Sequence, residues 1–284
     1  MHPLAILLKF IKNPYNPIEN LKTYQVVKHL FAYVFFGITS NVIIFGIIQA
    51  VAPSKAVENV SPAITVNNWS EAWVFIIQAV LLAPLVEEFL FRGPISKGST
   101  VFKKISFSFA LFLLLFVLQS IQITATKILG YNKLAFLIAA IVIGLAVPLL
   151  ISNKAYNSPR FTNIYIYLQA IIFALFHINN TNFSSSFAYI LAPFLILNQL
   201  YLGFVTALVA RNYGFMKAVL LHLINNFISV LIVVALSIDG NILIRITLAI
   251  LAISAYLYGL WAFLDETFIH YKSNKDKGID IRLS

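Results

Sequence analysis

The sequence predicts an all-α, polytopic transmembrane helical bundle of about eight spans. Of the 284 residues, 60% are apolar and only 11% are charged, whereas soluble domains contain about 45–50% apolar and about 25% charged residues. So few charged side chains cannot cover a soluble surface, and the high apolar content excludes a disordered chain. The chain has no cysteine, which excludes disulfide scaffolds, thiolate metal sites and cysteine nucleophiles.

Eight stretches are apolar over about the 20 residues that a membrane-spanning helix requires. They are residues 30–52, 72–92, 105–124, 134–152, 162–180, 187–210, 216–237 and 242–264. With eight spans, sixteen of the 20 Lys and Arg residues lie on the side that carries both termini, three lie on the other side, and Arg245 sits just inside the last span. Because Lys and Arg are enriched in cytoplasmic loops, we expect a multi-pass protein of the plasma membrane with both termini in the cytoplasm.

The apolar pattern divides the chain into five segments. Residues 1–29 form an N-terminal segment in which Leu4, Leu7, Leu8 and Ile11 share one face of a short interfacial helix. Four segments follow. They are a first span with an external loop (30–71), a core with an inserted helix pair (72–237, the pair at 105–152), a last span (238–264) and a polar, loosely ordered cytoplasmic tail (265–284). Although the net charge is +10, the basic residues are scattered between apolar runs, so we expect membrane lipid and not nucleic acid as a partner. The oligomeric state stays open.

Three of the spans carry the ionisable groups that mark a functional site in a membrane, where such groups are costly. Span two ends in LLAPLVEEFLFRGP, which contains Glu87, Glu88 and Arg92. Glu88 and Arg92 are four residues apart, so they share a helix face and form an ion pair, while Glu87 points about 100° away. Span five carries FALFH with His177, and span seven carries HLINN, in which His222 and Asn226 point together. A carboxylate, two imidazoles and a carboxamide that converge in a bundle can hydrolyse an amide.

These three stretches resemble a known family of membrane enzymes. EEFLFRG, FALFH and HLINN are similar, in order, to the EExxxR, FxxxH and HxxxN or HxxxD motifs of the CPBP family (the CAAX prenyl protease and bacteriocin-processing, or Abi, family) of intramembrane endopeptidases. The resemblance covers roughly residues 72–235. It implies that the chain hydrolyses a peptide bond of a membrane-associated peptide or protein, either with or without a lipid modification. In the family the second motif usually follows in the next span, whereas here two apolar spans intervene.

The resemblance and the chemistry of the side chains together suggest a role for each residue. Glu87 is the candidate general base that takes a proton from a water molecule, as the resemblance implies. Glu88 and Arg92 form the structural ion pair that holds the helix end. His177 orients the water or donates a proton to the leaving amine, and His222 and Asn226 donate to the oxyanion. For His222 and Asn226 the alternative is simple interhelical hydrogen bonding. For Glu87 it is a buried carboxylate that stays protonated and bonds a neighbour, for Glu88 a direct catalytic role, and for His177 an interfacial histidine bonded to Asn179 or Asn180.

The sequence leaves the following alternatives open. No cofactor is expected, but glutamate and two histidines are also zinc ligands, so a metal-dependent reaction stays possible in principle. No span contains an aspartate and no GxSxG is present, so aspartate and serine mechanisms are not favoured. A non-catalytic scaffold of the same fold and a small proton-linked transporter are the alternatives to a protease.

Overall fold

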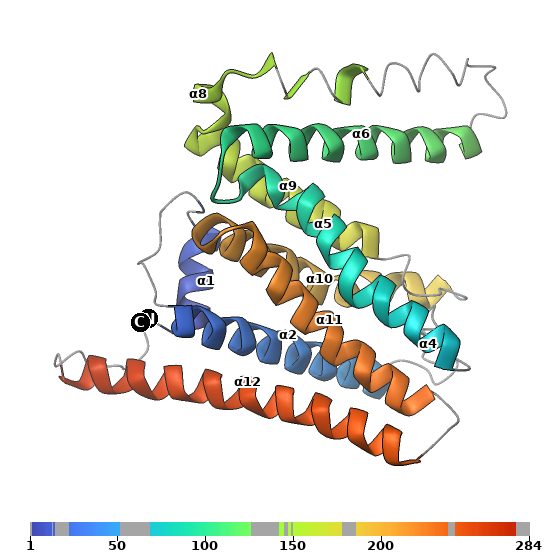
Figure 1. The fold of residues 1–284 in the computed structure, drawn as a ribbon, viewed down its shortest axis with the longest axis vertical. Helices are drawn as coiled ribbons and strands as arrows, with labels where there is room; N and C mark the ends of the chain where they lie inside the picture. The colour runs from blue at the N-terminus through green and yellow to red at the C-terminus, as the bar shows by residue number, and fades with distance from the viewer. Residues whose placement is uncertain are drawn as a thin grey trace.

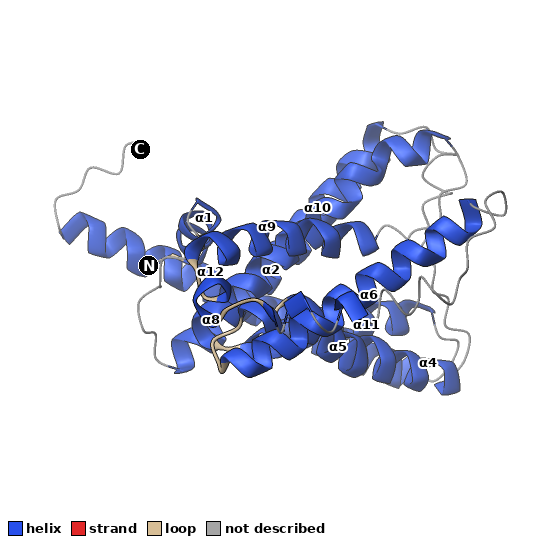
Figure 2. Cartoon of the chain, turned by 90° about the horizontal axis from the view of Figure 1, so that it is seen from above, coloured by secondary structure: helices blue, strands red, loops and turns tan. Residues whose placement is uncertain are grey.

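A computed structural model describes residues 2–12, 14, 23–51, 69–125, 142–144, 147, 148, 150–177, 186–237 and 242–276. Within these residues helix is the only regular secondary structure (Figure 2). The elements are α1 (Pro3–Lys12), α2 (Thr23–Val51), α4 (Trp69–Ile76), the π-helical η1 (Ile77–Leu82), α5 (Ala83–Phe91), the 3₁₀ turn η2 (Gly93–Ile95), α6 (Thr100–Ala125), α8 (Asn153–Tyr156), α9 (Pro159–Phe176), α10 (Ser186–Tyr213), α11 (Phe215–Ser237) and α12 (Ile242–Asp276). The all-helical prediction is therefore confirmed for the described chain.

The helices form a bundle in which α6 lies at one end of the long axis and α12 at the other (Figure 1). α5, α9, α10 and α11 lie between them, and α2 packs along α12. Gly259 allows this close packing, because a Cβ atom there would lie 2.8 Å from the Phe31 carbonyl oxygen on α2. The core of the bundle is made by buried side chains of α1, α2, α9, α10 and α11.

Within the described residues, four helices are long and apolar enough to cross a membrane. They cover Thr23–Ile44, Trp69–Phe91, Phe215–Ile232 and Ile242–Glu266. Large apolar side chains such as Ile250, Leu257 and Trp261 remain exposed along α12, and an apolar surface of this extent is typical of a protein that meets lipid. Helices also occur in the expected spans 105–124, 162–180 (as far as Phe176) and 187–210, whereas most of 134–152 lies outside the described residues.

Two segment boundaries differ from the sequence prediction. The last helix does not end at Leu264 but continues to Asp276, where we expected a loosely ordered tail. The first long helix begins at Thr23, so Lys28 lies inside it and contacts Asp265 and Glu266 of α12. This buried ion pairing extends both helices beyond the apolar runs, and apolar content alone does not reveal it.

The N-terminal helix α1 buries a different face from the one we expected. Ile6, Leu7 and Phe10 are buried in the core, whereas Leu8 is 61% exposed. The Tyr33 hydroxyl of α2 donates a hydrogen bond to the Pro3 carbonyl (3.0 Å). α1 is therefore held against the bundle by its own apolar side chains.

The turn after α5 fixes the position of the helix end that carries the two glutamates. Gly93 lies so close to α6 that a Cβ atom would overlap the Ser106 side chain. The buried Tyr156 hydroxyl donates to the carbonyls of Pro94 (3.2 Å) and Lys103 (3.0 Å). Burial raises the pKa of this hydroxyl, so it stays a donor near neutral pH.

Candidate functional site: a Glu–His–His cluster between three helices

The ionisable side chains of three distant chain segments meet in the interior of the bundle. Glu87 lies on α5, His177 follows the last residue of α9, and His222 lies on α11. The Glu87 Oε2 atom is 3.7 Å from the Nε2 atom of His177 and 3.7 Å from the Nε2 atom of His222. The glutamate and both histidines expected from the sequence therefore face one another.

The hydrogen bonds on the far side of each imidazole fix its neutral tautomer. His222 Nδ1 lies 2.8 Å from Glu88 Oε1, and His177 Nδ1 lies 2.8 Å from the Phe173 carbonyl oxygen. A carbonyl oxygen and an ionised carboxylate only accept hydrogen bonds, so each Nδ1–H is the donor. In the neutral imidazoles both Nε2 atoms are then acceptors that face the acceptor Oε2 of Glu87. Three facing acceptors require at least one proton shared among them or a donor placed between them.

Glu88 has two charged or polar partners and is completely buried. Its Oε1 atom lies 3.4 Å from Arg92 Nη1, and both side chains have no exposed area. The same oxygen accepts the hydrogen bond from His222. The i, i+4 spacing predicted the contact with Arg92, but the contact with His222 joins residues 134 positions apart and no sequence pattern indicated it.

Phe173, the first residue of the FALFH stretch, is the apolar centre of this site. The sequence did not indicate a role for it. Its ring centroid lies 4.4 Å from that of His177 and 5.8 Å from that of His222. The guanidinium carbon of Arg92 lies 4.0 Å from the same ring, a distance at which cations are attracted to aromatic faces. The ring therefore packs against both imidazoles and the guanidinium.

Asn226 lies in another environment from the one we expected. Its Nδ2 atom donates to the Ala79 carbonyl of the π-helical segment (2.9 Å), and its Oδ1 atom accepts from Asn225 Nδ2 (3.2 Å). The side chain thus bonds to the span that carries the glutamates, eight residues before Glu87. The sequence placed His222 and Asn226 on one face, but it did not indicate this carbonyl partner.

No group of three or more His, Asp or Glu side chains suited to holding a metal ion occurs within the part of the chain that the structure describes. The contacts of 3.7 Å also join only one oxygen of Glu87 to the two imidazoles.

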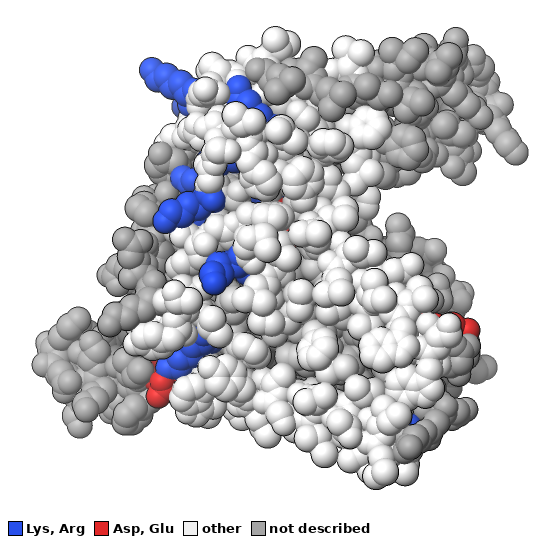
Figure 3. Space-filling view, in the orientation of Figure 1, with Lys and Arg blue, Asp and Glu red and all other residues white. Residues whose placement is uncertain are grey.

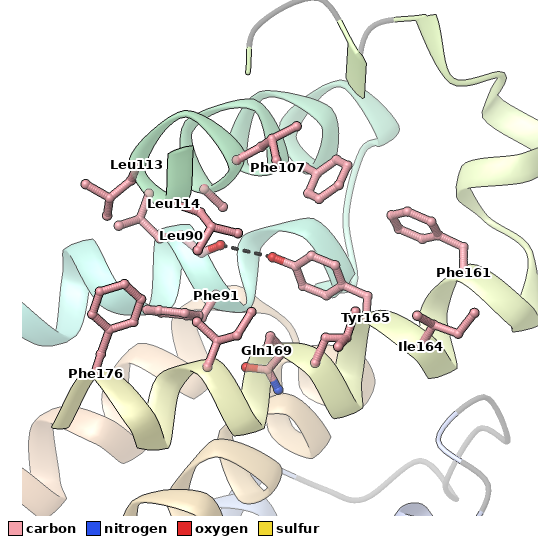
Figure 4. Close-up of a pocket in the computed structure, with 14 residues that line it drawn as sticks. Leu90, Phe91, Phe107, Leu113, Leu114, Phe161, Ile164, Tyr165, Gln169 and Phe176 are labelled. Carbon is pink, nitrogen blue, oxygen red and sulfur yellow. Dashed lines mark hydrogen bonds between the residues drawn. The ribbon is translucent and has the colours of Figure 1, made fainter. Parts of the chain in front are cut away.

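An apolar cavity of about 220 Å³ adjoins the site between α5, α6 and α9 (Figure 4). Phe91 and Phe176, whose ring centroids are 6.1 Å apart, lie in its wall, and Phe91 also contacts Phe173. Tyr165 donates to the Leu90 carbonyl (3.2 Å) within the wall. An engineered apolar cavity of about 150 Å³ binds benzene, so this one has room for a larger hydrocarbon group.

No protein-family model, curated protein or solved structure matches this chain. Membership of the family that the three motifs resemble stays a prediction.

Proposed function

We propose that the chain is an intramembrane endopeptidase in which Glu87 activates a water molecule. The observation that carries this proposal is the placement of Glu87 Oε2 at 3.7 Å from two imidazole Nε2 atoms that arrive on separate helices. Catalytic contacts are often long before substrate binds. A water held at this point gives a proton to the Glu87 carboxylate while its oxygen attacks the peptide carbonyl carbon.

The two histidines complete the proton balance of this reaction. The water oxygen forms the new C–O bond, the C–N bond breaks, and the proton taken by Glu87 passes to the leaving amine directly or through an imidazole. His222 in its protonated form is stabilised by the Glu88 carboxylate behind it, so its Nε2–H can donate to the developing oxyanion. His177, held by the Phe173 carbonyl, can donate to the leaving amine.

The adjoining cavity suggests the kind of substrate. Its described lining is apolar apart from Tyr165 and Gln169, so it favours a hydrocarbon group next to the scissile bond over a polar one. A large apolar side chain and a lipid modification both have this chemistry. We therefore propose a membrane-associated peptide or protein as the substrate.

We also propose that the chain crosses the plasma membrane eight times with both termini in the cytoplasm. Lys and Arg side chains gather along one edge of the face seen in Figure 3, the edge at which α1 and α8 lie in Figure 1. α2 starts and α12 ends at this same edge. Basic residues on one side of a set of spans are typical of the cytoplasmic side.

A comparison of membrane peptides in cells that carry wild-type protein, Glu87→Gln or Glu71→Gln tests the proposed function. Glu71 is an exposed carboxylate in the first turn of α4 and serves as the matched control. We expect cleaved fragments with wild type and Glu71→Gln that are absent with Glu87→Gln, at equal protein levels. Identical fragments in all three would reject the protease and favour the non-catalytic scaffold.

A further inference from the structure

The span that carries both glutamates contains a π-helical segment one turn before them. In residues Ile77–Leu82 the hydrogen bonds run from residue i+5 to residue i, as the bond from Ala83 N–H to the Gln78 carbonyl shows. Such a segment adds one residue to an α-helix. At 3.6 residues per turn, one added residue turns everything after it by about 100°. The direction in which Glu87 and Glu88 point therefore depends on this segment.

Proline leaves one carbonyl of the segment without its backbone donor. In the π pattern, the next bond after Ala83 to Gln78 would run from residue 84 to the Ala79 carbonyl. Residue 84 is a buried proline, which has no N–H. A carbonyl without a partner is unfavourable in an apolar span, and the Asn226 Nδ2 atom donates to the Ala79 oxygen at 2.9 Å.

We propose that Asn226 is a positioning residue that replaces the missing N–H of Pro84 and locks the π-helical segment to α11. His222 lies on the same helix four residues earlier, one turn away. A single rigid helix thus provides both the imidazole of the site and the bond that sets the rotation of the two carboxylates towards it. This inference does not depend on peptide hydrolysis, because it concerns how the cluster is assembled.

Restoring the backbone donor tests this inference directly. Pro84→Ala supplies an N–H that can bond to the Ala79 carbonyl, so it should compensate for the loss of the amide in Asn226→Leu. Ser229→Ala is the control, because it removes an exposed side-chain donor of the same helix that bonds only within α11. The readout is the ¹⁵N spectrum of histidine-labelled protein in detergent. The chain has only five histidines, and His177→Gln and His222→Gln identify the two signals of the site.

We expect Asn226→Leu to abolish the hydrogen-bonded Nδ1–H signal of His222, because Glu88 turns away from it. Pro84→Ala combined with Asn226→Leu should restore this signal, and Ser229→Ala should leave it unchanged. If a cleaved peptide is found in the cellular comparison, its cleavage should fall about 100-fold in Asn226→Leu, as misplacement of catalytic groups by about 1 Å can cause, and recover in the double variant.

Two results would overturn the inference. One is an unchanged His222 signal in Asn226→Leu, and the other is a double variant as perturbed as Asn226→Leu. An Asn226→Leu protein that does not fold is still informative, since the inference then requires the double variant to fold. A direct oxyanion role of Asn226 predicts that Pro84→Ala restores no cleavage, so the two roles give different results.

Discussion

Replacing Glu88 by glutamine should destabilise the protein far more than the same change at its neighbour Glu87. Glu88 lies 3.4 Å from Arg92, and both side chains are fully buried. At an effective dielectric constant of about 20, a pair at this distance attracts by about 5 kcal/mol, and a hydrogen bond to a charged group such as that of His222 contributes about 1.5–3 kcal/mol. The removal of Glu88 desolvation offsets part of this loss. We therefore expect a net loss of about 3–5 kcal/mol, which is usual when one partner of a buried pair is removed.

Thermal unfolding in detergent, followed by fluorescence of the three tryptophans, measures this difference. At about 2–4 °C per kcal/mol, Glu88→Gln should lower Tm by roughly 6–20 °C. Glu87→Gln is the matched control, because the Glu87 side chain is 27% exposed and, among the described residues, its partners at ion-pair distance are the two imidazoles. Scan rates must be equal, because unfolding of membrane proteins is often irreversible.

A double variant separates the charge effect from a packing effect. Arg92→Met combined with Glu88→Gln removes both charges, and replacement of a buried pair by apolar groups is often close to neutral. The double variant should therefore unfold at a higher temperature than Glu88→Gln alone. An equal or lower Tm for the double variant, or equal shifts for the two neighbouring glutamates, would refute the reasoning.

Three further variants test other parts of the structure by the same thermal assay. Gly93→Ala should cost about 1–3 kcal/mol because its methyl group overlaps α6, while Gly98→Ala, which has nothing within 4 Å of the added Cβ, should be neutral; equal shifts would contradict the packing of this turn. Lys28→Met should cost about 1.5–3 kcal/mol because the buried Glu266 carboxylate loses its ammonium partner at 3.1 Å, and no loss would show that the α2–α12 pairing is weak. Ala110→Leu should raise stability by about 1–2 kcal/mol by filling the apolar cavity, and a lowered Tm would show that the cavity does not accept it.

The helices could be predicted from the sequence because apolar runs are long and separated by polar residues. The ends of the helices were harder to predict. Lys28 and Glu266 look like loop residues in a hydropathy pattern, yet each lies inside a helix because the other neutralises it. A helix also carries Arg160 and Gln169 between Pro159 and Phe176, and such polar residues reduce the hydropathy on which a span prediction relies. The ends of these helices therefore depend on pairing between residues distant in the sequence, which apolar content alone does not predict.

The residues of the candidate site could also be named from the sequence, but only some of the contacts between them could be predicted. Fixed spacing along one helix predicted the contact between Glu88 and Arg92. The π-helical segment was not predicted, since no local pattern distinguishes it from an α-helix. The partners of His222 and Asn226 on α5 and η1 depend on the rotation that this segment introduces. A sequence pattern based on 3.6 residues per turn cannot predict this rotation.

The charges of the site and its hydrogen-bond acceptors both bear on whether Glu87, His177 and His222 hold an additional proton. Glu87 and Glu88 carry two negative charges and Arg92 one positive charge, so the cluster is neutral only when it holds one additional proton. The facing acceptors of Glu87, His177 and His222 independently require a shared proton or a donor placed between them. Because a net charge is expensive in a buried site, the charge balance favours one additional proton on the cluster, and a proton shared among these side chains is what general acid–base catalysis needs. In Glu88→Gln the remaining charges of Glu87 and Arg92 already balance, so the shared proton is no longer required.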